Sequence, residues 1–139
     1  MKIKRLALIF AVLVLAAALS ACMDASITIA GEPLDFLRAD ISDSFEGIAP
    51  AAGNSILTLR FVAKNQNPDL TKISEGFFGE TPCTLSDGTN SYPCKSIAFE
   101  NNGGKLNVLP VFEVPSSLAG SGAKLTLSGN AFSSIQLKI

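Results

Sequence analysis

The sequence predicts an all-β fold in which two antiparallel sheets pack face to face. Along short runs, apolar residues alternate with polar ones, which is the period of a half-buried strand. Gly, Pro, Asn and Asp separate these runs, and no long stretch has the 3.6-residue apolar period of an amphipathic helix. Because most runs have one apolar and one polar face, they suit sheets covered on one side rather than a parallel sheet buried on both.

The expected strands follow one another along the chain from residue 26 onwards. Their ranges are 26–30, 36–42, 56–65, 96–100, 106–114, 124–128 and 134–139. Two shorter runs, 83–86 and 91–94, flank a turn-forming segment. An immunoglobulin-type sandwich has about seven strands in about 100 residues. The sequence therefore favours an immunoglobulin-like antiparallel β-sandwich of about seven to nine short strands.

The alternation also predicts which side chains of each run face the core. In two of the runs these are Leu57, Leu59, Phe61 and Ala63, and Leu37, Ala39 and Ile41. Pro110 interrupts the run 106–114 and has no backbone N–H to donate to a ladder. We therefore expect an edge strand or a bulge at Pro110.

A secretory signal is expected before the domain. Residues 1–5 are basic and residues 6–19 form an apolar run of 14, which is shorter than the about 20 residues that a membrane-spanning helix needs. This run ends in Leu19-Ser20-Ala21-Cys22, which resembles the bacterial lipobox. The resemblance implies a diacylglycerol on the Cys22 thiol, cleavage before Cys22 and N-acylation with a fatty acid such as palmitate. The alternative is an ordinary signal peptide with an incidental cysteine, because Ser20 and Ala21 also suit an ordinary cleavage site.

Three segments are therefore expected: a signal peptide at 1–21, a lipidated Cys22 with a short linker at 22–33, and the sandwich domain at 34–139. The part after the signal has eight basic and 12 acidic residues, a formal charge of −4, which argues against nucleic acid as a partner. Two or three acyl chains would hold the chain on a membrane. By the enterobacterial sorting pattern, Met23 directly after the cysteine favours the outer membrane of the bacterial cell envelope if the host has two membranes.

Cys83 and Cys94 are expected to form a disulfide. A hairpin centred on Gly88-Thr89 places them opposite each other, at a Cα separation of about 4.5–5.5 Å that a disulfide can bridge. A two-residue loop at Asp87-Gly88 would place Cys83 opposite Tyr92 instead. A disulfide thus favours the Gly88-Thr89 turn or a four-residue loop around it.

No motif indicates a catalytic or metal site, and no cofactor is expected. The chain has no histidine, which excludes a Ser-His-Asp triad, and two cysteines beyond Cys22 cannot build the usual four-ligand zinc site. Ser121-Gly122-Ala123-Lys124 matches a Ser-x-x-Lys motif, but it lies between glycines and a strand rather than on a helix. The tight spacing of a calcium loop is absent from the acidic residues Asp35, Asp40, Asp43 and Glu46, which indicate a solvated face.

The pair Phe77-Phe78 is the most unusual apolar feature. Adjacent side chains on a strand point to opposite faces, so both rings are not expected in one core. One ring is expected in the core, and the other packs under a loop or on the outer face of a sheet. Alternatively, one of the two aromatic rings anchors a protein partner.

The second half of the chain resembles the small immunoglobulin-like domain family of many uncharacterised bacterial lipoproteins and secreted antigens, including the mycobacterial immunoprotective antigen. The motifs that carry the resemblance are LTLRFVAKNQNPD (57–69), TLSDGTNSY (84–92), LPVFEVPSS (109–117) and the closing IQLKI. It covers about residues 55–139, and the cysteine pair is not part of the pattern. The resemblance implies the fold and an extracytoplasmic setting, and it implies no catalytic residues.

These features predict a membrane-anchored envelope lipoprotein that is not an enzyme and acts as a non-catalytic binding or structural module. Its expected partners are the membrane, through the lipid on Cys22, and an envelope protein. One alternative is a small-ligand carrier, which would need an apolar cavity. Another is a hydrolase of the cell envelope, which would need buried polar groups in a cleft.

Overall fold

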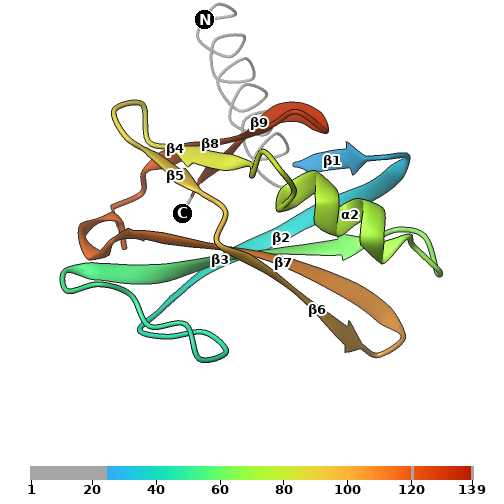
Figure 1. Cartoon of the computed structure of the whole chain (residues 1–139), viewed down its shortest axis with the longest axis horizontal. Coiled ribbons are helices and arrows are strands. Elements are labelled where there is room, and N and C mark those ends of the chain that lie inside the picture. Colours follow the sequence, from blue (N-terminus) through green and yellow to red (C-terminus); the bar gives the residue numbers. More distant parts are fainter. Residues whose placement is uncertain (1–24, 120, 139) are drawn as a thin grey trace, which may run out of the picture.

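The computed structural model describes residues 25–119 and 121–138, which form a sandwich of two antiparallel sheets (Figure 1). The five-stranded sheet has the order β1-β2-β3-β7-β6 and the four-stranded sheet the order β5-β4-β8-β9. The first sheet contains β1 (Ser26–Ile29), β2 (Glu32–Ser42), β3 (Asn54–Ala63), β6 (Ser96–Asn102) and β7 (Lys105–Pro115). The second contains β4 (Thr84–Ser86), β5 (Ser91–Pro93), β8 (Lys124–Gly129) and β9 (Phe132–Lys138). Two short helices, α2 (Leu70–Phe77) and η1 (Ser116–Leu118), complete the described elements.

The strand order confirms the immunoglobulin-like sandwich that the sequence predicts. Immunoglobulin domains pair their strands as A-B-E-D in one sheet and C-F-G in the other. Here β2-β3-β7-β6 has the chain order of A-B-E-D, and β4-β8-β9 has that of C-F-G. β1 is an additional edge strand beside β2, and β5 extends the second sheet beside β4.

The core lies between the sheets and contains the predicted inner face of β3. Leu57, Leu59, Phe61 and Ala63 are all buried there. Phe77 connects the two layers, because its ring lies 5.7 Å from that of Phe61 in β3 and 5.7 Å from that of Phe132 in β9, measured between centroids.

The domain begins at Ser26 rather than at residue 34, so residues 26–33 of the expected linker at 22–33 belong to the sheet. β1 pairs with β2 in a hairpin that turns through Ala30 and Gly31, both of which have positive φ. Ile27 and Ile29 are buried in the core. Two alternating isoleucines and a Gly at the turn are enough to build an edge strand.

Leu37 does not face the core, contrary to the alternation expected in β2. The register with β3 shifts between Phe36, which pairs with Phe61, and Arg38, which pairs with Arg60. Leu37 is the extra residue of this β-bulge and is 51% exposed. Ala39 and Ile41 do pack against the core, as predicted, because the bulge changes the alternation before them.

Pro110 lies in a central strand rather than at an edge. β7 pairs with β3 on one side and β6 on the other, and Pro110 lies opposite Ile97 of β6. The ladder with β3 is interrupted beside the proline, between the pairs Thr58–Val111 and Phe61–Val108. A missing N–H is tolerated there because the local pairing is already broken.

Helix α2 was not expected from the sequence. Asp69 caps its first turn, where its carboxylate accepts a hydrogen bond of 3.2 Å from the N–H of Lys72. Ile73 and Phe77, four residues apart, are its buried side chains. Eight residues with one such pair are too short to give a clear helical period in the sequence.

The outer face of the five-stranded sheet is partly buried as well. Ile56, Leu109 and Val111 alternate with core residues and so point away from the core, yet all three are fully buried. The loop 43–53 between β2 and β3 lies on this side of the sheet (Figure 1) and is tied to it by the Ala51 N–H, which donates to Glu113 at 3.4 Å. The end of the face beyond this loop carries charged side chains.

Candidate functional site

Three adjoining pockets lie around Val62 at the open end of the outer face of the five-stranded sheet. Their volumes are about 220, 430 and 500 Å³, and Val62 lines all three. The smallest, which we call the basic pocket, has walls that include Leu37, Arg38, Arg60, Val62, Lys105 and Asn107. No acidic side chain of the described chain lines the basic pocket.

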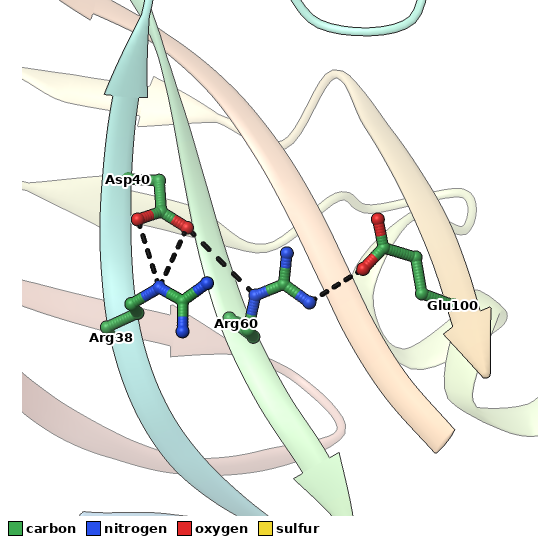
Figure 2. Close-up of polar contacts among 4 residues, drawn as sticks. All are labelled: Arg38, Asp40, Arg60 and Glu100. Carbon is green, nitrogen blue, oxygen red and sulfur yellow. Dashed lines mark hydrogen bonds and ion pairs between the residues drawn. The ribbon is translucent and has the colours of Figure 1, made fainter. Parts of the chain in front are cut away.

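Beside this pocket, four charged side chains form a row across the sheet (Figure 2). Nε of Arg38 donates to both carboxylate oxygens of Asp40, at 3.1 and 3.2 Å. Nη1 of Arg60 donates to Glu100 at 2.7 Å, and Nε of Arg60 lies 4.0 Å from Asp40. The row thus connects β2, β3 and β6.

The two arginines occupy directly opposed positions of the β2–β3 ladder. Like charges opposite each other destabilise a sheet. Asp40 and Glu100 offset this repulsion, but they engage only one nitrogen of each guanidinium in a hydrogen bond. Figure 2 shows the remaining terminal nitrogens without a partner among the residues drawn.

Two buried polar atoms near this row have no hydrogen-bond partner within the described chain. They are Nε of Arg60, whose side chain is 15% exposed, and Oγ1 of Thr58. Buried polar atoms in proteins are nearly always paired, so such atoms need an explanation. The 4.0 Å from Arg60 Nε to Asp40 is too long for a hydrogen bond.

At the other end of the outer face, Glu113 fastens the loop 43–53. Its carboxylate accepts hydrogen bonds from Nδ2 of Asn54 at 2.7 Å and Nζ of Lys95 at 3.1 Å. These contacts, that of Asn54 first, hold the pKa of Glu113 below its ordinary value. These hydrogen bonds position the loop, and they leave few hydrogen-bond donors free at this end of the face.

The cysteines lie in the register expected for a hairpin centred on Gly88-Thr89. β4 and β5 pair Leu85 with Tyr92 and Ser86 with Ser91, which excludes the two-residue Asp87-Gly88 loop. The N–H of Cys94 donates to the carbonyl of Cys83 at 2.8 Å.

Both cysteines are buried thiols in the structure. The pKa of Cys83 is raised, first because its thiol shares a hydrogen bond with Cys94 and second because it is buried. The sulfur atoms are thus neighbours, and the disulfide between them stays a prediction.

Phe77 and Phe78 have different environments, although they lie at the end of a helix rather than on a strand. Phe77 is fully buried, whereas Phe78, the residue after the last turn of α2, is 44% exposed. Leu70 at the start of the helix is exposed as well. Phe78 is therefore the member of the pair that a partner could reach.

The remaining sequence-based candidates build no site in the described chain. Cys22 lies outside the described residues. Ser121 precedes β8 in a loop, so Ser121 and Lys124 do not share a helix face. Asp35 pairs with Lys64 at 3.3 Å, and within 25–119 and 121–138 no three His, Cys, Asp or Glu side chains are placed to hold a metal ion.

The alternation of the run 36–42 places Arg38 and Asp40 on one face, but no pattern in the sequence connects them with Arg60 or Lys105. The connection depends on the bulge and on the pairing of distant strands, neither of which a local pattern shows. No protein-family model, curated protein or solved structure matches this chain. No helix in the described part is long and apolar enough to cross a membrane.

Proposed function

We propose that the chain is a lipid-anchored protein of the bacterial cell envelope whose sandwich acts as a non-catalytic binding module. The observation that carries the proposal is the sequence Leu19-Ser20-Ala21-Cys22 directly after a basic segment and a 14-residue apolar run. β1 starts at Ser26, four residues after Cys22. A lipid on Cys22 would therefore hold the sandwich close to the membrane surface.

The distribution of polar groups supports binding rather than catalysis. Charged side chains of the described chain lie in ion pairs on an open sheet face, where a ligand or partner can reach them. The core contains buried apolar side chains from both sheets, which suits a rigid scaffold better than a carrier with an apolar cavity. The resemblance to small immunoglobulin-like lipoprotein domains supports the same interpretation.

Metabolic labelling with an alkyne fatty acid tests the anchor. The wild-type protein should be labelled, should fractionate with membranes and should lose residues 1–21. Cys22→Ala should abolish both the label and the membrane association, because two or three acyl chains are needed for lasting attachment. Cys94→Ala, which leaves the lipobox intact, should remain labelled. A wild-type protein that carries no label, or a labelled Cys22→Ala variant, would contradict the proposal.

A further inference from the structure

We propose that the basic pocket binds the phosphate group of a small anionic ligand, a phosphate monoester with a short apolar body. This inference goes beyond the lipid anchor and does not depend on it. It rests on the geometry of the bulge, the free arginine donors, the charge distribution and the size of the pocket.

The β-bulge builds the wall of the pocket. In a regular strand, Leu37 and Arg38 would point to opposite faces of the sheet. Because Leu37 is the extra residue, both side chains line the same pocket on the outer face. Bulges are frequent next to binding sites, where they redirect a side chain, and this one places an apolar surface beside a guanidinium.

The donors of the pocket exceed its internal acceptors. Arg38 and Arg60 face each other across the ladder and retain terminal nitrogens that Asp40 and Glu100 do not engage (Figure 2). Lys105 has no ion-pair partner within the part of the chain that the structure describes. An oxyanion placed between these groups would accept from both guanidinium groups and relieve their mutual repulsion.

Positive charge is concentrated around these pockets, although the chain as a whole is acidic. After the expected cleavage the chain has a formal charge of −4 with eight basic residues. Four of these eight line the three adjoining pockets, namely Arg38, Arg60, Lys64 and Lys105, whereas one acidic residue of the described chain, Asp35, lines them and pairs with Lys64. Locally gathered cations attract anions even on an acidic protein, because interactions between exposed charges fall off within about 8 Å at physiological salt.

A phosphate ester suits the pocket better than a bare anion. The three cations that line the basic pocket, two of which also pair with Asp40 and Glu100, can donate to the several oxygens of a phosphate monoester, whose charge is about −1.5 to −2. The pocket volume of about 220 Å³ leaves room for a small organic body, and Leu37 and Val62 offer it an apolar wall. Such a group can come from a soluble ester or from a lipid headgroup.

Titration of the ¹⁵N-labelled full-length protein in neutral detergent micelles with propyl phosphate tests the site. We expect saturable shifts in the arginine side-chain resonances and in the backbone amides of β2 and β3. Arg38→Gln combined with Lys105→Gln should weaken binding by about tenfold or more, because charge-assisted hydrogen bonds are lost. Both side chains are exposed, so the double variant should fold. An NMR spectrum that matches the wild type away from the substituted residues checks that it does.

Lys124→Gln is the matched control, since it removes an exposed lysine from the other sheet and should leave the affinity unchanged. Short-chain phosphatidic acid in the same micelles distinguishes the two sources: stronger binding of the lipid than of propyl phosphate assigns the headgroup, and the reverse assigns the soluble ester. The proposal is overturned by shifts that do not saturate, that chloride reproduces at equal ionic strength, or that persist unchanged in the Arg38→Gln/Lys105→Gln variant. None of these outcomes bears on lipidation, which the labelling of Cys22 tests separately.

Discussion

At the scale of single residues, Cys83 and Cys94 show how a register turns two distant positions into neighbours. They lie opposite each other and are both buried, and the N–H of Cys94 donates to the carbonyl of Cys83 at 2.8 Å. In an oxidising envelope such a pair is expected to be oxidised. Closing a loop of about 12 residues would stabilise the fold by roughly 3 kcal/mol in the chain-entropy model.

Cys83→Ala should therefore lower the free energy of unfolding by roughly 3 kcal/mol in the absence of reductant. Denaturant unfolding with and without dithiothreitol measures this. The reductant should destabilise the wild type, but should leave Cys83→Ala and Cys83→Ala/Cys94→Ala unchanged. Alkylation of both thiols in the unreduced wild type would show that the disulfide does not form.

Asp87 at the tip of the same hairpin makes local stability depend on pH. Its carboxylate accepts hydrogen bonds from the N–H groups of Asn90 and Thr89, at 2.6 and 2.8 Å, and from the Tyr92 hydroxyl at 2.8 Å. These contacts, that of Asn90 first, hold the pKa of Asp87 below its ordinary value. The folded state therefore favours the ionised form, and its stabilisation is present above the unfolded pKa and lost as pH falls through the folded pKa.

The difference in unfolding free energy between wild type and Asp87→Ala should be constant above about pH 5 and should shrink below about pH 4, near the ordinary pKa of aspartate. Denaturant unfolding measured across this range gives the difference directly. Asp87→Asn retains an acceptor oxygen without a titrating charge, so its difference from Asp87→Ala should not vary with pH. A wild-type difference that is flat from pH 7 to pH 3 would contradict the linkage.

At the scale of elements, sequence alternation predicted the strands and failed where the alternation is broken. All nine expected runs overlap observed strands: seven have the period-two pattern that one covered face imposes, and the runs 83–86 and 91–94 flank the turn of their hairpin. The bulge at Leu37 was missed, because an inserted residue changes the alternation without leaving a mark in composition. Helix α2 was missed because its buried pair, Ile73 and Phe77, spans barely one turn.

The end of α2 offers a direct comparison of a core ring with a surface ring. Phe77→Ala should lower the free energy of unfolding by about 3–5 kcal/mol, because it leaves a cavity between Phe61 and Phe132. Phe78→Ala should change it by about 0.5 kcal/mol or less, as an exposed side chain does. Thermal or denaturant unfolding measures both.

The same pair tests the predicted partner contact. If Phe78 anchors an envelope protein, Phe78→Ala should keep wild-type stability but recover less of that protein after cross-linking in intact cells. Glu75→Ala, an exposed change one turn earlier in α2, is the matched control. Recovery that is equal for wild type and both variants would remove Phe78 from the contact.

At the scale of the whole molecule, the fold was predictable and the candidate site was not. The two-layer arrangement follows from the number of half-buried strands and the short turns between them. The basic pocket requires three things together: the bulge in β2, the direct pairing of Arg38 with Arg60, and the turn that brings Lys105 beside them. The turn through Gly103 and Gly104 is local, but the pairing of β2 with β3 and the bulge within it depend on contacts between residues far apart in the sequence, so no local pattern could have located the pocket.

The packing of α2 against β1 is another contact of this long-range kind, and it can be tested by a double-mutant cycle. A Cβ added at Gly76 would overlap Cγ2 of Ile29, which is fully buried in β1. Alanine favours a helix over glycine by about 1 kcal/mol, but overpacking a core costs about 1–3 kcal/mol, so Gly76→Ala should destabilise the protein.

Ile29→Ala alone should cost about 2–5 kcal/mol, because it leaves a cavity at the edge of the core. It also removes the methyl group that a Cβ at residue 76 would strike. In the double variant the alanine at residue 76 therefore occupies space that Ile29 has vacated. Its higher helix propensity then stabilises α2 without the cost of overpacking. The cost of the double variant should be smaller than the sum of the two single costs by at least about 1 kcal/mol, which denaturant unfolding can resolve. Additive costs would show that α2 and β1 do not pack as closely as the structure has them, and Glu75→Ala, which is exposed, should show no coupling to Ile29→Ala.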